Sequence, residues 1–381
     1  MDKPTSYAAE FNLDKNIVYL NHAAVSPWPV RTRNAVIQFA EENSRFGSLN
    51  YLQWLETETA LRKQLQSLIN APSHLDIALV KNTSEALSMV AYGIDWHPGD
   101  NVVITDQEFP SNHIVWETLA SQGVELRTAD ITNDKKTPEQ CIFDRCDLHT
   151  RLISVSSVQY ASGLKLNLPQ IGQFCKLHNI LFCVDAIQSI GALRFDVQQC
   201  LADFVMADGH KWMLGPEGLG FFYCASHIRE QLKLTQYGWH MMEDYANFSV
   251  QHWRVAQSAR RFECGSPNML GIHALHASLS LILEVGMAEI EHRLLGNTRC
   301  MLDEIIQQEN LELLSPADMD RLGGIVTFKH KYHPPRVVYN KLRQQNILCA
   351  ERGGGIRFSP HFYTDPEKIR TAIRLANIIS E

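Results

Sequence analysis

The sequence predicts an α/β protein in which a large domain with a mostly parallel, seven-stranded sheet is followed by a smaller C-terminal α+β domain. Three observations predict this class. The chain has 381 residues, which is more than one compact core commonly holds. Its first two-thirds contain short apolar runs that alternate with helical patterns, as in a parallel sheet covered on both faces. After about residue 260 a long helical segment leads into shorter strand-like runs.

The elements of the large domain follow from the spacing of apolar residues. Residues 31–70 carry apolar side chains at helical spacing and predict two helices that are broken near Gly47. Strands are predicted from short runs rich in Val and Ile: 77–80, 102–105, 124–127, 152–155, 181–184, 204–206 and 220–223. Helical patterns between these runs lie at 83–92, 114–121 and 168–178.

The C-terminal part is predicted to begin with one long helical segment over residues 270–296. Strand-like runs at 324–328 and 356–359 and a helix from Asp365 follow, and residues 18–20 are assigned to the same unit. We therefore expect three parts. An N-terminal segment, 1–30, packs on the small domain and the active site, and it precedes a large domain at 31–260 and a small domain at 261–381.

Composition excludes several classes of protein. With 35 basic and 42 acidic residues the formal net charge is −7, so the chain lacks the excess of positive charge that is typical of proteins that bind nucleic acid or an anionic membrane. The N-terminal residues are polar, and the longest apolar stretch, 277–287, is too short to span a membrane. Nine cysteines without a CxxC pair read as reduced thiols. We expect a cytoplasmic enzyme without a nucleic-acid or membrane partner.

Polar residues follow five of the predicted strands. In doubly wound sheets, ligands bind outside the carboxyl ends of the strands, so these residues are expected at one rim. They are Asn82 to Ser84, Glu108 and Phe109, Ser156 to Gln159, Asp185 and Gln188, and Asp208 to Lys211.

Taken singly, these residues have ordinary structural explanations, such as a helix cap at Asn82, a turn residue at Asp185 and a solvated Lys211. Together they favour one cofactor, pyridoxal phosphate. That cofactor needs a lysine for its aldehyde, a carboxylate for its ring nitrogen, an aromatic ring partner and a helix N-terminus for its phosphate. No metal site is predicted, because His273 and His276 lack a third ligand.

The chain resembles the fold-type I pyridoxal phosphate enzymes of the class V aminotransferase family, which includes cysteine desulfurases, isopenicillin N epimerase-like proteins and kynureninase. Seven ordered segments carry the resemblance almost from end to end. They are YLNHAAVSPWP at 19–29, KNTSEAL at 81–87, EFPSN at 108–112, VDAIQ at 184–188, ADGHKWMLGPEGLG at 207–220, RFECGSPN at 261–268 and IRFSPHFYT at 356–364.

The resemblance implies a role for each matching residue. Lys211 would bind the cofactor aldehyde, Asp185 would face the ring nitrogen, and Arg357 would clamp the substrate α-carboxylate. The remaining cofactor contacts that it implies are Thr83, Ser84 and His210 at the phosphate, Phe109 on the ring, and Gln188 at the ring hydroxyl or a Schiff-base atom. Gln159, or Ser157 in its place, would lie on the side of the substrate or the ring hydroxyl.

Further positions follow from the same resemblance. Asn21 and His22 would line the substrate pocket. Ser266 would reach the phosphate of a neighbouring subunit, which implies a homodimer with shared active sites. Asp208 stands where desulfurases have Ser, and we assign it an orienting role beside the cofactor.

The resemblance implies an enzyme that acts on an amino acid through an external aldimine and removal of the Cα proton. A class V aminotransferase is the first expectation. A cysteine desulfurase, a selenocysteine lyase-like protein or another β-eliminating lyase is the second, and an epimerase the third. A catalytically silent pyridoxal phosphate-binding protein is disfavoured, because the lysine, the acid and the arginine are all present.

One departure bears on the second expectation. Desulfurases carry a nucleophilic cysteine on a loop before the carboxylate-binding arginine, and this chain has only ILCAERGGGIRF there, at 347–358. Cys349 lies in an apolar run typical of a buried structural thiol, so desulfuration through a protein-bound persulfide is disfavoured.

Overall fold

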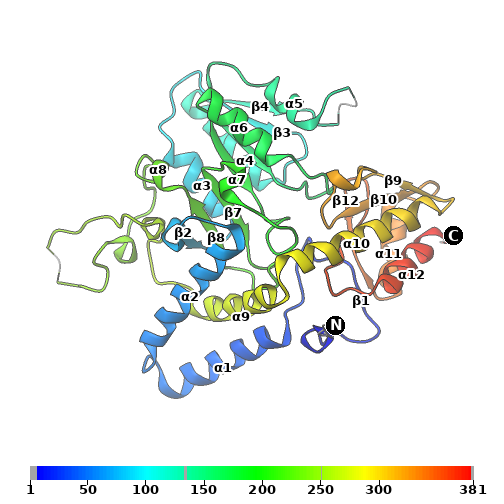
Figure 1. Cartoon of the computed structure of the whole chain (residues 1–381), viewed down its shortest axis with the longest axis horizontal. Coiled ribbons are helices and arrows are strands. Elements are labelled where there is room, and N and C mark those ends of the chain that lie inside the picture. Colours follow the sequence, from blue (N-terminus) through cyan, green and yellow to red (C-terminus); the bar gives the residue numbers. More distant parts are fainter. Residues whose placement is uncertain (1–6, 133–134, 250, 379–381) are drawn as a thin grey trace.

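A computed structural model describes residues 7–132, 135–249 and 251–378 of the chain. Its main feature is a seven-stranded sheet with helices on both faces (Figure 1). The strands lie in the spatial order β2 (Ile77–Val80), β8 (Gly220–Cys224), β7 (Phe204–Asp208), β6 (Leu181–Asp185), β5 (Thr150–Ser156), β3 (Asn101–Thr105) and β4 (Glu125–Ala129). Only β8 runs antiparallel to its neighbours, so the predicted mostly parallel sheet is confirmed.

Strand register brings the polar strand ends to one edge. Ser156 at the end of β5 pairs with Asp185 at the end of β6, and Asp185 in turn pairs with Met206 of β7. Strands β2, β3, β7 and β8 are buried along their whole length, which explains their unbroken apolar sequences. The carboxyl ends of β5, β6 and β7 therefore lie at the same edge of the sheet.

Helices connect these strands close to the predicted places. The pattern over residues 31–70 forms α1 (Val30–Phe46) and α2 (Tyr51–Ile69), which break at Gly47 with a φ of 58°. The other helices of this part are α3 (Thr83–Gly93), α4 (Ser111–Glu117), α5 (Pro138–Phe143), α6 (Leu168–His178), α7 (Val197–Cys200) and α8 (Ser226–Arg229). After α4 the chain tightens into a 3₁₀ turn over Thr118–Gln122.

The single long helix predicted over 270–296 is wrong. The structure has two helices, α9 (Met269–Val285) and α10 (Met287–Ile306), which are bent by 83° at Gly286. Gly286 has a φ of 84°, a conformation that ends an α-helix and suits glycine. Helix α9 packs against α1 and α2 and joins the core of the large sheet, whereas α10 continues to the C-terminal part (Figure 1). The division at residues 260 and 261 stays a prediction.

The C-terminal part has its own sheet and its own core. Its four antiparallel strands lie in the order β12 (Ala350–Arg352), β13 (Gly355–Phe358), β10 (Val326–His330) and β9 (Leu311–Leu313). The flanking helices are α10, α11 (Pro335–Gln344) and α12 (Pro366–Asn377). Near the N-terminus, β1 (Val18–Tyr19) pairs in parallel with β11 (Ile347–Leu348), which confirms that residues 18–20 belong to this unit.

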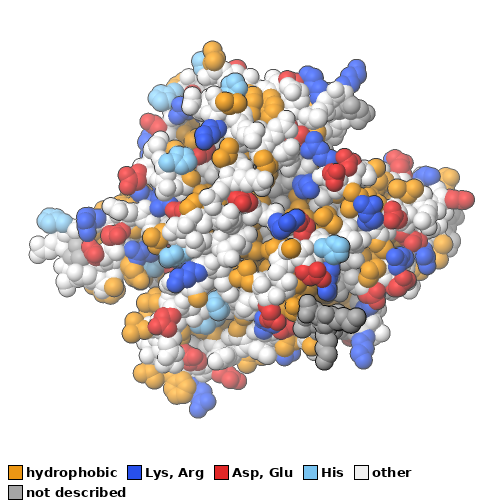
Figure 2. Space-filling model, viewed as in Figure 1, with side chains coloured by type: hydrophobic (Ala, Val, Ile, Leu, Met, Phe, Trp, Pro, Cys, Tyr) orange, Lys and Arg blue, Asp and Glu red, His pale blue; other side chains and the backbone are white. Residues whose placement is uncertain are grey.

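The face of the molecule shown in Figure 2 carries basic and acidic side chains that are interspersed. In the part of the chain that the structure describes, no single helix has the length and apolar character needed to cross a bilayer. Only the bent pair of α9 and α10, taken together, meets that test of length and composition.

Candidate active site

A cavity of about 400 Å³ lies at the edge of the large sheet where β6 and β7 end. Its walls come from these strand ends, from the first turn of α3 and from β13. Nine of the residues predicted from the sequence line it: Thr83, Ser84, Phe109, Asp185, Gln188, Asp208, His210, Lys211 and Arg357. The fold therefore brings most of the predicted site together.

Lys211 and Asp185 are the two buried ionisable groups at its centre. Burial, with a smaller effect of the Arg357 charge, lowers the pKa of the Lys211 amine to about 8 against the opposing charge of Asp185. Burial raises the pKa of the Asp185 carboxyl to about 7, although its Oδ1 accepts a hydrogen bond from the Ile187 amide at 3.0 Å. The Lys211 Nζ lies 5.5 Å from the centre of the Phe109 ring. Both groups can thus change protonation near neutral pH.

The first turn of α3 forms an anion cradle on one wall. The Asn82 side chain caps the helix by accepting a hydrogen bond from the Glu85 amide at 2.9 Å. Among the described residues, the buried Thr83 Oγ1 and His210 Nδ1 have no hydrogen-bond partner. Unpaired buried polar atoms beside a helix N-terminus suit a bound phosphate, because the helix dipole and the free donors both favour an anion.

Asp208 shares this wall with the cradle. Its carboxyl accepts a hydrogen bond from the Thr83 backbone and lies 3.7 Å from His210 Nδ1. Burial raises the pKa of Asp208 to about 6. An anion bound nearby would raise that pKa further, since like charges disfavour each other. The carboxyl can therefore sit beside an anion in its neutral form.

Gln188 is held in one orientation by two buried contacts. Its Oε1 accepts a hydrogen bond from Trp212 Nε1 at 2.8 Å, and its Nε2 donates to the Ala23 carbonyl at 3.1 Å. Since the oxygen is already occupied by the indole, the amide presents its remaining N–H as a donor. Trp212 therefore orients a lining residue from the position next to Lys211.

Arg357 enters the cavity from β13. The side chain is 3% exposed, and its Nη1 donates to the Tyr160 carbonyl at 2.6 Å. Within the described residues it has no carboxylate partner, and its Nε has no hydrogen-bond acceptor. Burial lowers the pKa of Arg357 to about 10, and the charge of Arg352 adds to the shift. A buried guanidinium without an acid partner is suited to bind a substrate carboxylate.

Two predicted residues point away from the cavity. Gln159 is buried, and its Nε2 donates to Thr105 Oγ1 at 3.1 Å and to Glu108 Oε1 at 3.2 Å. His22 is fully buried, with its ring nitrogens within hydrogen-bond distance of the Ser359 carbonyl and the Tyr363 hydroxyl. Neither residue belongs to the cavity lining, because interior polar groups already engage both side chains.

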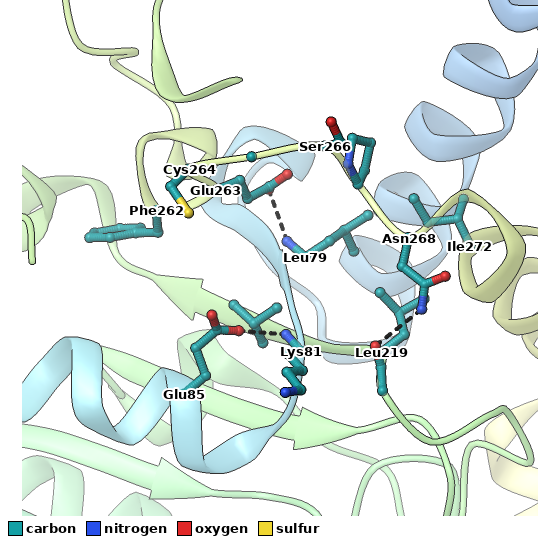
Figure 3. Close-up of a pocket in the computed structure, with 14 residues that line it drawn as sticks. Leu79, Lys81, Glu85, Leu219, Phe262, Glu263, Cys264, Ser266, Asn268 and Ile272 are labelled. Atoms are coloured by element: carbon teal, nitrogen blue, oxygen red, sulfur yellow. Dashed lines mark hydrogen bonds between the residues drawn. The ribbon is translucent and has the colours of Figure 1, made fainter. Parts of the chain in front are cut away.

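The remaining two predicted residues, Asn21 and Ser266, line other cavities. Asn21 lines a neighbouring cavity beside β12, and its buried Oδ1 has no partner in the described part of the chain. Ser266 is exposed between the 3₁₀ turn at Ala259–Phe262 and α9. As Figure 3 shows, it borders a pocket together with Leu79 and Lys81.

The sequence analysis missed several lining residues. Ser111, Tyr160, Glu217 and Arg352 also face the active-site cavity. Tyr160 directly follows a predicted residue and Glu217 lies in the glycine-rich segment after Lys211, so position along the chain could have suggested both. No local signal marks Arg352, because it is brought in by the second sheet.

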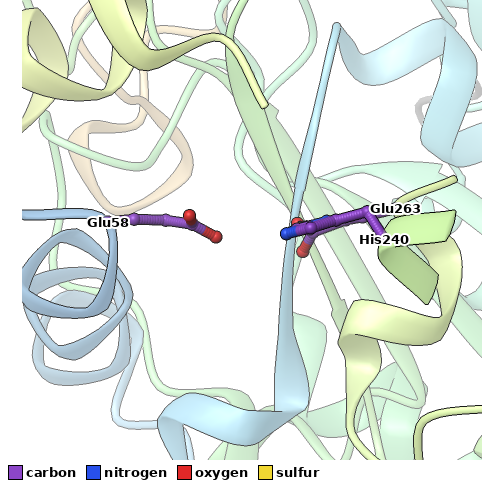
Figure 4. Close-up of side chains that lie close together, drawn as sticks. All are labelled: Glu58, His240 and Glu263. Carbon is purple, nitrogen blue, oxygen red and sulfur yellow. Dashed lines mark ion pairs between the residues drawn. The ribbon is translucent and has the colours of Figure 1, made fainter. Parts of the chain in front are cut away.

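Three further ionisable side chains meet outside this cavity: Glu58, His240 and Glu263 (Figure 4). The carboxylate oxygens of Glu58 and Glu263 already accept hydrogen bonds from other parts of the protein. Arg62 donates two hydrogen bonds to Glu263, at 2.6 and 2.8 Å, and one to Glu58 at 2.5 Å. The Leu79 amide of β2 also donates to Glu263 at 2.9 Å. This cluster is an ion-pair network that ties α2 to β2 and to the segment before α9.

Comparison with known proteins gives a consistent result. The family model described as Aminotransferase class-V matches residues 18–373. A probable cysteine desulfurase of Methanothermobacter thermautotrophicus is 29% identical over 374 residues, covering 93% of this chain and 92% of that protein. A cysteine desulfurase of Yersinia pestis is 28% identical, covering 95% of this chain and 89% of that protein.

Solved structures share the fold. The apo cysteine desulfurase of Thermococcus onnurineus NA1 superposes with a TM-score of 0.87 at 23% identity, covering 98% of this chain and 97% of that one. The cystine C–S lyase C-DES with its product cysteine persulfide gives a TM-score of 0.88 at 23% identity, covering 95% of this chain and 98% of that one. A C-DES mutant with glycine covalently linked to its pyridoxal phosphate gives 0.89 at 22% identity, covering 99% and 100%.

Because the pKa of Asp185 is raised, we expect that replacing this carboxyl with a neutral amide increases the free energy of unfolding, by an amount that depends on pH. A carboxyl whose pKa rises on folding stabilises the fold below its unfolded pKa, and this contribution is lost as the pH rises to about 7. In the cofactor-free protein above pH 7, the free energy of unfolding of Asp185→Asn should therefore exceed that of wild type by about 4 kcal/mol. The difference should shrink toward pH 4. Urea unfolding at pH 4 to 8 measures it, with Asp303→Asn on the exposed face of α10 as the control. A difference that does not vary with pH would contradict the buried charge.

Proposed function

Because the chain belongs to the class V aminotransferase family, we propose that it is a pyridoxal phosphate enzyme that cleaves the carbon–sulfur bond of cysteine or a cysteine derivative. The observation that carries this proposal is the cavity in which Lys211, Asp185 and Arg357 converge. The named relatives are cysteine desulfurases and a cystine lyase. These relatives favour our second expectation, a cysteine desulfurase or another β-eliminating lyase, over the first, an aminotransferase.

The residues present fit the cofactor. The Lys211 amine is buried, with a lowered pKa, as a group that bonds to an aldehyde requires. Asp185 would face the ring nitrogen. The unpartnered Thr83 Oγ1 and His210 Nδ1, together with the N-terminus of α3, would hold the phosphate.

Pyridoxal phosphate supplies an aldehyde that bonds to amines and a ring that withdraws electrons from the Cα atom of a bound amino acid. The side chains of this protein supply the rest. Arg357 binds the α-carboxylate of the substrate and fixes its orientation. The Lys211 amine, with a pKa of about 8, would serve as the base that takes the Cα proton of the substrate. The Asp185 carboxylate would keep a positive charge on the ring nitrogen of the bound cofactor.

The fate of the sulfur follows from the β12–β13 hairpin. Only Gly353 and Gly354 connect the two strands, with φ values of 57° and 76°. A two-residue turn with both φ values positive is a tight hairpin, and it leaves no loop that could carry a cysteine over the cavity. This hairpin supports the expectation that the desulfurase loop is missing.

No thiol of the same chain lines the cavity where it could accept the sulfur. All nine cysteines are unpaired, and none of them lines the active-site cavity. Cys349 is buried in the small core between β11 and β12, and burial raises the pKa of its thiol to about 12. A thiol with that pKa is protonated at neutral pH and is a poor nucleophile.

The reaction that fits these residues is therefore β-elimination. The Cα–H and Cβ–S bonds break, the proton passes to Lys211, and the sulfur leaves with its substituent as a thiol. Hydrolysis of the remaining fragment gives pyruvate and ammonium. A substrate RS–CH₂–CH(NH₃⁺)–COO⁻ plus water thus yields RSH, pyruvate and ammonium. For cystine, RSH is cysteine persulfide, the product named for C-DES.

The same proposal includes a homodimer that works in a reducing compartment, with cytoplasmic location as the simplest case. Ser266 is exposed and lies outside the cavity of its own chain, as a residue shared with a neighbouring subunit would. The unpaired state of every cysteine supports the reducing compartment.

Lys211→Ala tests the cofactor. Wild-type protein incubated with pyridoxal phosphate should gain an absorption band in the visible range, because the Lys211 amine bonds to the aldehyde. The variant should lack this band and all turnover. Lys329→Ala, in the exposed ion pair with Glu312 on β10, should keep both. A colourless wild-type protein, or an unchanged band in Lys211→Ala, would overturn the assignment.

Product analysis tests the reaction. L-cystine should give pyruvate and cysteine persulfide in equal amounts, and alkylation of the protein with iodoacetamide should leave kcat unchanged, since no cysteine takes part. Cys349→Ala should behave as the alkylated wild type does. Alanine formed with sulfur bound to the protein would indicate the desulfurase route instead. A keto acid formed together with the pyridoxamine form of the cofactor would instead support our first expectation, an aminotransferase.

Ser266→Ala tests the shared site. Light scattering should give twice the chain mass of 43.3 kDa. Loss of one hydrogen bond to a charged phosphate should raise the dissociation constant for pyridoxal phosphate about tenfold. Ser121→Ala, in the 3₁₀ turn after α4, is the control. A monomer, or equal affinities of the two variants, would contradict the shared site.

A further inference from the structure

A second cavity adjoins the active-site cavity. It is open to solvent, has a volume of about 600 Å³ and lies between β12, α11 and the segment after β1. The two cavities share Ala24 and Arg352 in their linings. Arg352 therefore stands between the two cavities.

Arg352 carries a positive charge without an acidic partner. It is the last residue of β12, and its Nη1 donates to the backbone carbonyl of Glu351 at 2.9 Å. No ion pair links it to any carboxylate within residues 7–132, 135–249 and 251–378. Arg357 likewise has no acidic partner among the described residues, so two guanidinium groups without a neutralising carboxylate line one cavity. Each of them favours an anionic group of the ligand.

The acids of the cavity do not neutralise this pair. Asp185, Asp208 and Glu217 come from β6, β7 and the segment after Lys211, and none of them forms an ion pair with either arginine in the described structure. An α-amino acid has one carboxylate, which Arg357 binds in the proposed function. Arg352 is then left for a second acidic group, farther along the same substrate.

The adjoining cavity can also receive an amine. Asn21 Oδ1 is buried and has no partner in the part of the chain that the structure describes, and this residue lines the cavity. Glu351 lines it as well, with its carboxylate 3.1 Å from Arg336. A guanidinium beside an unpaired amide oxygen and a carboxylate is complementary to the charged end of an amino acid.

We propose that Arg352 determines substrate specificity by binding a carboxylate at the far end of an S-substituted cysteine. The substrate class is a cysteine whose sulfur bears an acidic or amino-acid tail, and a cysteine disulfide is the case that would use both the guanidinium and Asn21. This inference rests on the proposed function in two respects: Lys211 binds pyridoxal phosphate, and Arg357 binds the α-carboxylate.

The test uses three cysteine derivatives of similar length that differ in tail charge: S-(2-carboxyethyl)-, S-propyl- and S-(2-aminoethyl)-cysteine. Their dissociation constants for the holoenzyme are measured from the change in its visible absorption, and KM and kcat are measured separately. Wild type should bind the carboxyethyl compound about fivefold more tightly than the propyl compound, as expected for a solvent-accessible ion pair, and this ratio should fall with added salt.

Three variants locate the effect. Arg352→Gln should bring the ratio to about one, because the isolated charge is gone. Arg352→Glu should reverse the preference toward the aminoethyl compound. Lys329→Gln is the control, and it should keep the wild-type ratio because Lys329 is paired with Glu312 outside both cavities.

The outcomes separate this inference from the proposed function. A wild-type ratio of one, or a ratio unchanged in Arg352→Gln, would overturn the role of Arg352. A shift of the ratio in Lys329→Gln alone would also overturn it. An Arg352-dependent preference in binding without release of any thiol would support the inference and refute carbon–sulfur cleavage.

Discussion

The burial of a carboxyl and an amine in one cavity is the constraint on which the rest of this structure depends. Asp185 and Lys211 are kept from water where β6 and β7 end, and burial alone moves both pKa values toward neutrality. Asp185 is the last residue of β6, and Lys211 lies in the turn that follows β7. The parallel register of β5, β6 and β7 supplies the rigid platform that holds them.

Other parts of the molecule maintain this arrangement. Trp212, which follows Lys211, is fully buried and fixes the amide of Gln188. A Cβ atom at Gly191 would lie 2.3 Å from the Trp212 carbonyl, and its φ is 90°, so only glycine fits beneath the lysine segment. Far from the cavity, Arg62 and Glu263 connect α2 with the segment that leads to α9.

The second sheet decides how the cavity is used. Its β12–β13 hairpin is closed by two glycines, so the wall that could have presented a cysteine presents Arg352 instead. The active-site cavity adjoins the cavity beside α11, and both have Arg352 in their linings. The two-residue hairpin thus leaves no loop for a cysteine and places an arginine between the two cavities.

The sequence by itself determined the strand runs, the break at Gly47, and the lysine and aspartate of the site, because these depend on local periodicity and on residues directly after strands. Only the tertiary structure decided the bend at Gly286, where one φ value separates two packing partners. It also turned Gln159 and His22 inward, toward Glu108 and Tyr363. Hydrogen-bond partners such as Tyr363 are hundreds of residues away, and charge pairing at Arg352 depends on which segments fold beside it. Side-chain direction and unpaired charge are set by such distant contacts, which no local pattern encodes.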